Sequence, residues 1–453
     1  MLKYLIKTYG CQMNYSDTER METYLNALGF SKTDVLKNAD IIIFNTCSIR
    51  QKAEQRVLGH MGDLALLRQK NKNLIVIITG CMTKKSSSRY SESRDKLFNR
   101  APGLDIALRI EELPKLASLL REINPKLKIN EIKEESLEDY FSIQANAKNN
   151  FQVFIPISTG CDKFCTYCIV PYSRGREKSR KVEEIVSEAK QFVENGCKEI
   201  TLLGQTVNSY GLSAYDTAHD FKKDIPKNKS PFVYLLERLD ELSKDGLVRV
   251  RFSSSHPKDF SDELINAIAK LKTQMPYVHL PVQAGNNDEL KRMNRPYKVE
   301  DFLEIIKKLR KKIPGICIST DVIVGFCGET EEEFMDTYNM IKDCAFDLVY
   351  ISQYSERKGT YASKNLKDDI SEKVKKSRWL ATNKLLKEVS FKNMKRFEGK
   401  KVDVLFEKYS KGENIGKSEH SKIVLVKSKK NLTGKILPIK IIEAKEWVLI
   451  GEE

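Results

Sequence analysis

Short apolar runs alternate with amphipathic stretches at the start of the chain. Leu2–Thr8, Ile41–Phe44 and Leu74–Ile78 are mostly apolar, which is typical of strands buried in a parallel sheet. The segment that begins at Ser16 is expected to be a helix, because its apolar residues fall on one face: Met21, Tyr24, Leu25 and Leu28. Residues 1–120 are therefore expected to form a parallel α/β domain.

The pattern changes after residue 120. Residues 121–150 are polar and charged and are expected to link two domains. Over residues 151–385 strand-like and helix-like segments alternate again, with six strands expected at Gln152–Ser158, Glu199–Leu203, Val248–Ser253, Tyr277–Val282, Ile316–Val324 and Phe346–Ser352. Six such units predict a partial (β/α)6 barrel, whose chemistry belongs at the carboxyl ends of its strands.

Amphipathic segments separate these strands. Helices are expected at Val182–Val193, Tyr234–Leu242, Asp262–Leu271 and Phe302–Leu309, after a capping box at Thr330-Glu-Glu-Glu333, and from Asp368 to Phe397. The polar insertion Ala214–Ser230 is expected to be a surface loop.

Residues 390–453 change to a β pattern. Short apolar runs at Lys401–Phe406, Ile423–Val426, Ile436–Ile442 and Trp447–Ile450 predict a small β-barrel. Residues 391–453 hold 15 basic against 9 acidic side chains, a net charge of +6. Such a module suits nucleic-acid binding, and the alternative is a structural module that only packs on the larger barrel.

Charge and length refine this picture. The 453 residues suit two or three domains, and a net charge of +16 favours a polyanionic partner, although a lysine-rich composition alone would also produce it. The chain has no signal-like start and no apolar run near the ~20 residues of a membrane span. A cytoplasmic protein without membrane contact is expected, in which clusters of the ten cysteines indicate metal binding.

Two groups of three cysteines carry the candidate chemistry. Cys161, Cys165 and Cys168 lie within eight residues, directly after the first barrel strand. Cys11, Cys47 and Cys81 each follow a strand of the first domain, and the carboxyl ends of parallel strands meet at one edge. Three thiolates can hold three irons of a 4Fe–4S cluster and leave the fourth open. They can also bind zinc, and spacing alone leaves both metals open.

Several motifs resemble those of known enzymes. The Cys161 run is similar to the signature of the radical S-adenosylmethionine enzymes. The wider pattern resembles their methylthiotransferase family, in motifs at Thr8–Asn14, Asn45–Arg50, Thr79–Met82, Val170–Glu177, Leu202–Gln205, Ser254–Pro257, His279–Gly285 and Gly325–Thr330. Gln-Met-Asn after Cys11 and Ser-Ile-Arg after Cys47 are similar to the subgroup that modifies isopentenyl-adenosine in tRNA.

The resemblance implies two 4Fe–4S clusters and S-adenosylmethionine. Cys161, Cys165 and Cys168 would hold the cluster that generates a 5′-deoxyadenosyl radical, and Cys11, Cys47 and Cys81 a second cluster that supplies sulfur. The implied product is 2-methylthio-adenosine next to the tRNA anticodon. Acceptors of related enzymes, threonylcarbamoyl-adenosine or a ribosomal protein, remain alternatives, as does a non-catalytic RNA-binding protein with zinc at both triads.

Further residues receive roles by the same resemblance. Gly204 and Gln205 are expected at the methionine amino group of S-adenosylmethionine. Arg174 and Arg176 are expected to meet a carboxylate or the tRNA phosphates, and the alternative is that both are ordinary surface charges. His279 and Gln283 are expected to line the substrate pocket or to pack as polar barrel residues. The implied partners are tRNA, bound through a TRAM-like tail, an electron donor and a sulfur or cluster donor protein.

Some positions depart from the family pattern. Cys327 replaces a proline, and the segment Tyr354–Thr360 lacks the prolines expected around Arg357. The remaining cysteines have no partner pattern and are expected to be buried or incidental thiols: Cys197, Cys317, Cys327 and Cys344.

Overall fold

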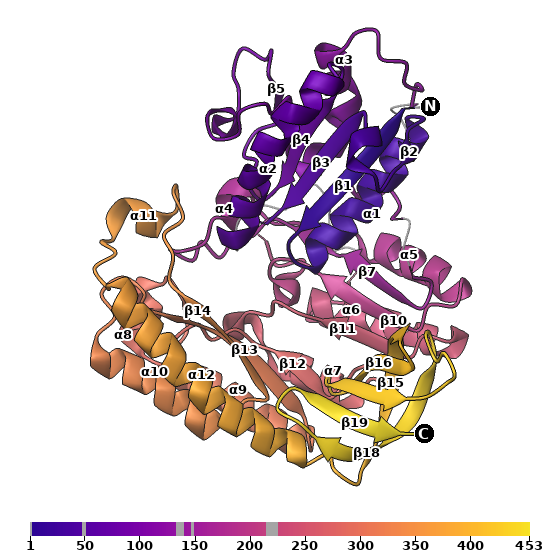
Figure 1. The fold of residues 1–453 in the computed structure, drawn as a ribbon. Helices are drawn as coiled ribbons and strands as arrows, with labels where there is room; N and C mark the ends of the chain where they lie inside the picture. Colours follow the sequence, from indigo (N-terminus) through magenta and orange to yellow (C-terminus); the bar gives the residue numbers. More distant parts are fainter. Residues whose placement is uncertain (1, 48–50, 133–139, 146–148, 214–224) are drawn as a thin grey trace.

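The first domain is built on a parallel sheet. The computed structural model describes residues 2–47, 51–132, 140–145, 149–213 and 225–453. Strands β1 (Lys3–Tyr9), β3 (Ile41–Thr46) and β4 (Ile75–Gly80) lie side by side and in parallel (Figure 1). Alternate residues of β3 and β4 point to opposite faces, so each face has its own apolar core. The parallel α/β prediction is confirmed.

Helices cover both faces of this sheet. Helix α1 (Gln12–Ala27) and helix α3 (Leu116–Ile123) pack in one core, and α2 (Gln51–Lys70) contributes Val57, Met61 and Leu64 to the other. The order of the six strands is β2-β1-β3-β4-β6-β5. Three short ones were missed: β2 (Ser31–Lys32), β5 (Ser87–Ser88) and β6 (Ile106–Leu108).

Two features of the first domain differ from the sequence expectations. Helix α1 begins at Gln12, not at Ser16, because Asn14 Oδ1 accepts a hydrogen bond from the backbone N–H of Cys11 and so closes the first turn earlier. Within the expected linker 121–150, Tyr140 and Ile143 are buried in the core that contains α1. The described part of that segment thus packs against the first domain.

All six expected barrel strands are present. They form two parallel sheets of three, β11-β10-β7 and β12-β13-β14. Their bounds are β7 (Gln152–Pro156), β10 (Glu199–Leu203), β11 (Arg249–Phe252), β12 (Tyr277–His279), β13 (Cys317–Val324) and β14 (Leu348–Gln353). A short antiparallel pair, β8 (Ser158–Thr159) with β9 (Lys178–Ser179), follows β7.

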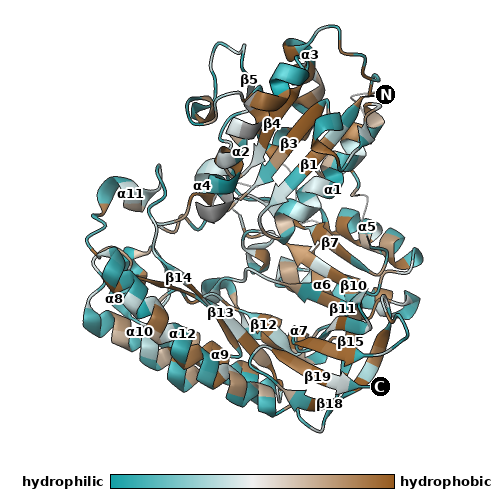
Figure 2. Ribbon diagram, viewed as in Figure 1, coloured by the Kyte–Doolittle hydropathy of each residue, from teal (hydrophilic) through white to brown (hydrophobic). Residues whose placement is uncertain are grey.

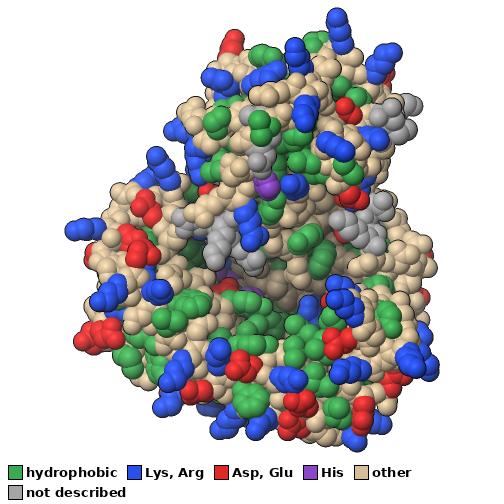
Figure 3. Space-filling view, in the orientation of Figure 1, with side chains coloured by type: hydrophobic (Ala, Val, Ile, Leu, Met, Phe, Trp, Pro, Cys, Tyr) green, Lys and Arg blue, Asp and Glu red, His purple; other side chains and the backbone are tan. Residues whose placement is uncertain are grey.

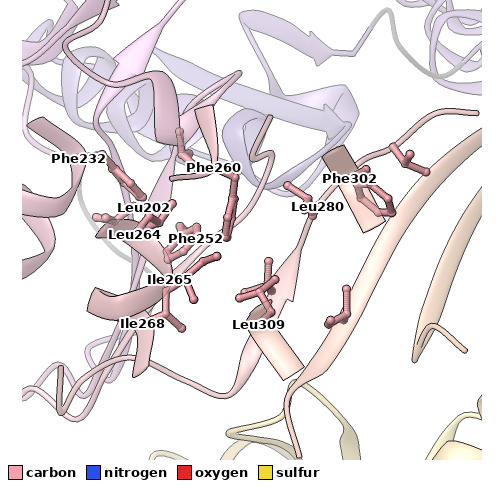
Figure 4. Close-up of a cluster of buried hydrophobic side chains, with 14 of the residues drawn as sticks. Leu202, Phe232, Phe252, Phe260, Leu264, Ile265, Ile268, Leu280, Phe302 and Leu309 are labelled. Carbon is pink, nitrogen blue, oxygen red and sulfur yellow. The ribbon is translucent and has the colours of Figure 1, made fainter. Parts of the chain in front are cut away.

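Amphipathic helices cover the outer side of the two sheets. These are α5 (Val182–Glu194), α6 (Pro231–Asp240), α7 (Asp262–Lys270), α9 (Val299–Lys312), α10 (Glu331–Cys344) and α12 (Glu372–Lys395). Shorter helices are α4 (Val170–Ser173), α8 (Asn287–Arg292) and α11 (Tyr361–Asn365). Brown faces of strands and helices meet between these layers in Figure 2, and Figure 4 shows Phe232, Phe252 and Phe260 packed there.

The tail is a closed five-stranded barrel, which confirms the β prediction. Its strands are β15 (Lys401–Ser410), β16 (Glu413–Ser418), β17 (Ile423–Lys427), β18 (Ile436–Ala444) and β19 (Val448–Glu452). Strand β16 was missed because its buried positions are Asn, Gly and Ser and lack an apolar alternation. Arg249 and Arg251 of β11 donate to tail carbonyls, at 2.7 Å from Asp403 and 2.8 Å from Ser418.

The tail therefore packs against the end of the sheet at which β11 begins.

No helix in the described ranges is long and apolar enough to cross a membrane. The expected loop Ala214–Ser230 lies outside the described residues up to position 224.

Candidate functional site

The structure brings Cys11, Cys47 and Cys81 together at one edge of the first sheet. The ladder of backbone hydrogen bonds extends to two of them, from Cys47 N–H to Tyr9 O at 2.9 Å and from Cys81 N–H to Thr46 O at 3.0 Å. Cys47 and Cys81 are buried, whereas Cys11 is exposed. The convergence that the sequence predicted therefore follows from the strand register.

The three thiols interact directly. A hydrogen bond from Cys47 lowers the pKa of Cys11 to about 6. Hydrogen bonds to Cys11 and Cys81, together with burial, raise the pKa of Cys47 far above its ordinary value. Repulsion between the thiolates opposes the loss of protons at this triad, and a bound cation relieves such repulsion.

Two asparagines fix this edge. Asn14 Nδ2 donates to Asn45 Oδ1 at 2.9 Å, and Asn45 Nδ2 donates to the Asn14 carbonyl at 2.7 Å. Helix α1 is thereby tied to the end of β3 beside the triad. Gly80 is required at the end of β4, because its φ is +91° and a Cβ atom would lie 2.2 Å from Thr46 O. The motif residues Ser48–Arg50 lie outside the described residues.

The second triad lies on the loop after β8. Cys161 is buried, and Cys165 and Cys168 are partly exposed. The loop is attached to the turn after α8, because Thr166 N–H donates to Met293 O at 3.1 Å and Asn294 Nδ2 to Phe164 O at 2.9 Å. Phe164 adopts a φ of +48°, which turns the chain between the first two cysteines.

Two polar side chains contact this second triad. Thr206 Oγ1 lies 3.4 Å from Cys161 Sγ, and Arg295 Nη1 donates to Cys165 Sγ at 3.4 Å. Burial raises the pKa of Cys161, and the bond with Thr206 opposes that change. The buried Arg295 guanidinium supplies positive charge where a deprotonated thiol needs it. Three thiols with such donors fit an iron–sulfur cluster with one open iron.

The two triads face each other across the domain boundary. Burial, followed by the Cys165 thiolate, raises the pKa of Cys168, and Cys81 of the first domain contributes to the same increase. Arg174 of the barrel domain reaches across, with its Nε donating to Cys81 Sγ at 3.5 Å. Figure 3 shows the surface hollowed between the upper domain and the barrel below it. The six cysteines thus belong to one composite site.

The expected cofactor residues lie beside Cys161. Gly204 and Gln205 follow β10 and are partly exposed, and a Cβ atom on Gly204 would lie 2.8 Å from Ser158 Oγ. Ser158 Oγ and His256 Nε2 are buried polar atoms with no hydrogen-bond partner in the described part of the chain. Because buried polar atoms normally have partners, these two atoms are suited to hydrogen-bond with a bound polar molecule.

The two arginines expected at a carboxylate or at tRNA phosphates differ. Arg176 is exposed, and its guanidinium lies 4.6 Å from the centre of the Phe164 ring. Arg174 is 4% exposed and contacts the Asp17 carboxylate of the protein itself. The phosphate alternative is therefore wrong for Arg174, because the fold buries this side chain between two domains.

The inner face of the second sheet is polar and is accessible at Tyr350. His279 pairs with Ser319, and Asp321 with Tyr350, in the strand register, so all four side chains share the face that the helices do not cover. Tyr350 is 52% exposed and makes an edge contact with His279, with ring centres 5.7 Å apart. Gln283 is buried, and its backbone bonds to β13, which favours the packing alternative for this residue.

Sequence reasoning missed several residues of this site. Asn14 and Asn45 lay within the quoted motifs, but their roles depend on a contact across 31 positions. Arg295, Thr206 and Tyr350 had no sequence signal, because each acts on a residue far away along the chain. The four cysteines without a partner pattern are buried, as expected: Cys197, Cys317, Cys327 and Cys344.

Known proteins match the whole chain. Family models match three parts: the uncharacterized protein family UPF0004 at residues 3–100, the radical SAM superfamily at 155–341 and the TRAM domain at 395–452. A tRNA-2-methylthio-N(6)-dimethylallyladenosine synthase from Clostridium botulinum strain Okra is 42% identical over 458 residues, covering 100% of this chain and 97% of the relative. Its counterpart from Caldicellulosiruptor saccharolyticus is 41% identical, covering 99% and 92%.

A solved structure shares the fold. The radical S-adenosylmethionine methyltransferase TsrM from Kitasatospora setae superimposes with a TM-score of 0.54 at 13% identity, covering 78% of this chain and 73% of that one. This similarity supports the fold over most of the chain and carries no information about the substrate.

Proposed function

Because this chain belongs to the radical S-adenosylmethionine family of tRNA-2-methylthio-N(6)-dimethylallyladenosine synthases, we propose that it methylthiolates carbon 2 of N6-dimethylallyladenosine next to the anticodon of tRNA. The observation that carries the proposal is the composite site: Arg174 donates to Cys81 Sγ at 3.5 Å, and the adjacent Gly175 carbonyl accepts from the Cys161 N–H at 3.1 Å. Two triads serve a reaction that needs both an oxidising radical and a sulfur source.

The superfamily uses a 4Fe–4S cluster and S-adenosylmethionine. Such a cluster, once loaded with S-adenosylmethionine, supplies a radical able to remove hydrogen from an unactivated aromatic carbon, which acid–base groups cannot do. Cys161, Cys165 and Cys168 would hold this cluster, and Arg295 would stabilise the charge on Cys165. Gly204 and Gln205 would contact the methionine part beside Ser158, and the exposed Arg176 is a further proposed contact of S-adenosylmethionine.

We assign Cys11, Cys47 and Cys81 to a second 4Fe–4S cluster that supplies sulfur. Electrons and replacement sulfur must come from elsewhere, so an electron donor and a sulfur or cluster donor protein are expected partners. We place this reaction in the cytoplasm, where tRNA is the substrate, and divide the chain into domains at 1–120, 151–385 and 390–453, with the linker at 121–150.

Nucleoside analysis tests the substrate. tRNA from cells that lack this protein is expected to lose 2-methylthio-N6-dimethylallyladenosine and to accumulate the unmethylthiolated nucleoside, as measured by mass spectrometry. Re-expression of the chain should restore the product. Loss of a methylthiolated threonylcarbamoyl-adenosine instead, or an unmodified ribosomal protein with normal tRNA, would assign the enzyme to another acceptor.

The inner face of the barrel is suited to a purine. Tyr350 is exposed beside His279, and stacking of a base on an aromatic ring contributes about 1–3 kcal/mol. Tyr350→Ala is therefore expected to raise the KM for tRNA about 5- to 150-fold with a smaller change in kcat. Tyr350→Phe keeps the ring and should stay near the wild-type value. Steady-state kinetics with an anticodon stem-loop measures both, and an unchanged KM in the alanine variant would exclude the stacking role.

A further inference from the structure

Arg174 occupies a buried position between the two domains. It caps the C-terminal end of α4 in the barrel domain and is 4% exposed. All three of its nitrogen positions face a charged or polarisable group of the first domain. Nη2 lies 2.8 Å from Asp17 Oδ2, Nη1 lies 3.7 Å from Glu111 Oε1, and Nε lies 3.5 Å from Cys81 Sγ.

Asp17 is held in place as firmly as Arg174. The Asp17 carboxylate lies on α1, and its second oxygen accepts a hydrogen bond from Tyr140 Oη at 2.5 Å. Asp17 and Tyr140 are 0% and 3% exposed. A buried guanidinium needs paired negative charge, and one carboxylate at 2.8 Å already supplies it. The Nε–H is then left to act on the Cys81 sulfur.

A hydrogen bond to a cysteine sulfur affects a bound cluster in a known direction. Donors and positive charge near the sulfur stabilise the more negative, reduced state and so raise the reduction potential, whereas nearby negative charge lowers it. Arg174 and Asp17 therefore oppose each other at Cys81. Removal of the arginine and removal of the carboxylate should move the potential in opposite directions.

We propose that Arg174 is a positioning residue that raises the reduction potential of a cluster held by Cys11, Cys47 and Cys81, and that Asp17 limits this effect. The inference rests on the proposed function, because it assumes a cluster at this triad. It also gives the barrel domain control over the sulfur-supplying site, since Arg174 and the Cys161 loop belong to the same domain.

The test isolates one cluster. In the full chain with Cys161, Cys165 and Cys168 changed to alanine, anaerobic reconstitution should leave about four irons at the first triad. The midpoint potential of that one-electron couple is measured by EPR during titration with dithionite and mediator dyes. Arg174→Gln is expected to shift the potential to a more negative value and Asp17→Asn to a more positive one.

A neighbouring arginine provides the matched control. Arg180 is also buried and interdomain, because it shares Glu188 with Arg20 of α1, at 2.5 Å and 2.9 Å, yet its hydrogen bonds go to Glu188 and to Pro156 O and not to a cysteine. Arg180→Gln should leave the potential of the first cluster unchanged. A purely structural role for Arg174 predicts that both glutamine variants lose stability alike and leave the potential in place.

The outcomes separate the two levels of the argument. If Arg174→Gln and Asp17→Asn retain four irons and shift the potential in the same direction, or not at all, the inference is wrong. If Arg174→Gln loses iron, Asp17→Asn decides alone, and an unchanged or more negative potential refutes the inference. If the parent variant binds no iron at all, the proposed second cluster fails, and the inference fails with it.

Discussion

A protein in which Cys11, Cys47 and Cys81 are alanine is expected to form no methylthiolated product and still to cleave S-adenosylmethionine. The thiols of this triad hydrogen-bond with one another and lie on the first domain, whereas the open-iron site lies on the Cys161 loop. Loss of the thiols in the first domain should therefore leave the iron site on the Cys161 loop intact. After anaerobic reconstitution the iron content should fall from about eight to about four per chain.

Three measurements check this result on one preparation. Iron analysis counts the clusters, chromatography of 5′-deoxyadenosine reports radical formation, and nucleoside mass spectrometry reports the product. Cys197→Ala is the control, because Cys197 is buried like Cys47 and Cys81 but donates to backbone carbonyls such as Glu199 O at 3.3 Å. Wild-type product formation by the triple variant would show that this triad supplies no sulfur.

The corresponding change at Cys161, Cys165 and Cys168 is expected to remove the radical itself. Neither 5′-deoxyadenosine nor product should form, which amounts to a loss of the full rate enhancement, on the order of 10⁶-fold or more. About four irons should remain at the other triad. Cys344→Ala, 5% exposed in the barrel core, serves as the control for loss of a buried thiol. Residual formation of 5′-deoxyadenosine would place the reactive cluster elsewhere.

Together the two triple variants divide the site by function. The variant without the first-domain triad should lose only the methylthiolated product. The variant without the Cys161 triad should lose both the product and the cleavage of S-adenosylmethionine. This asymmetry is stronger evidence than either loss alone, because unfolding would abolish both activities in both proteins. Folding of each variant can be confirmed by measuring its unfolding temperature while the cluster that it retains is still bound.

Most of the elements were predictable, because the signal for them is local. The apolar runs at Ile41 and Ile75 identify strands, and the periodic apolar faces of α5 and α7 identify helices. The errors in the predicted elements also have local causes. Strands β2 and β5 have two residues each, which is too short for an alternation, and β16 is buried through polar and small side chains. Helix α1 was placed too late because its first turn is closed by Asn14.

The candidate site divides in the same way. By itself the sequence determined the six cysteines, their positions after strands and the family resemblance, since short spacings and strand ends are written in consecutive residues. Only the tertiary structure decided which distant side chains meet these thiols. Arg174 contacts Asp17 from 157 positions away, and Arg295 contacts Cys165 from 130. Such contacts leave no periodic trace in the chain, because each depends on how distant segments pack in three dimensions and not on the pattern around either residue.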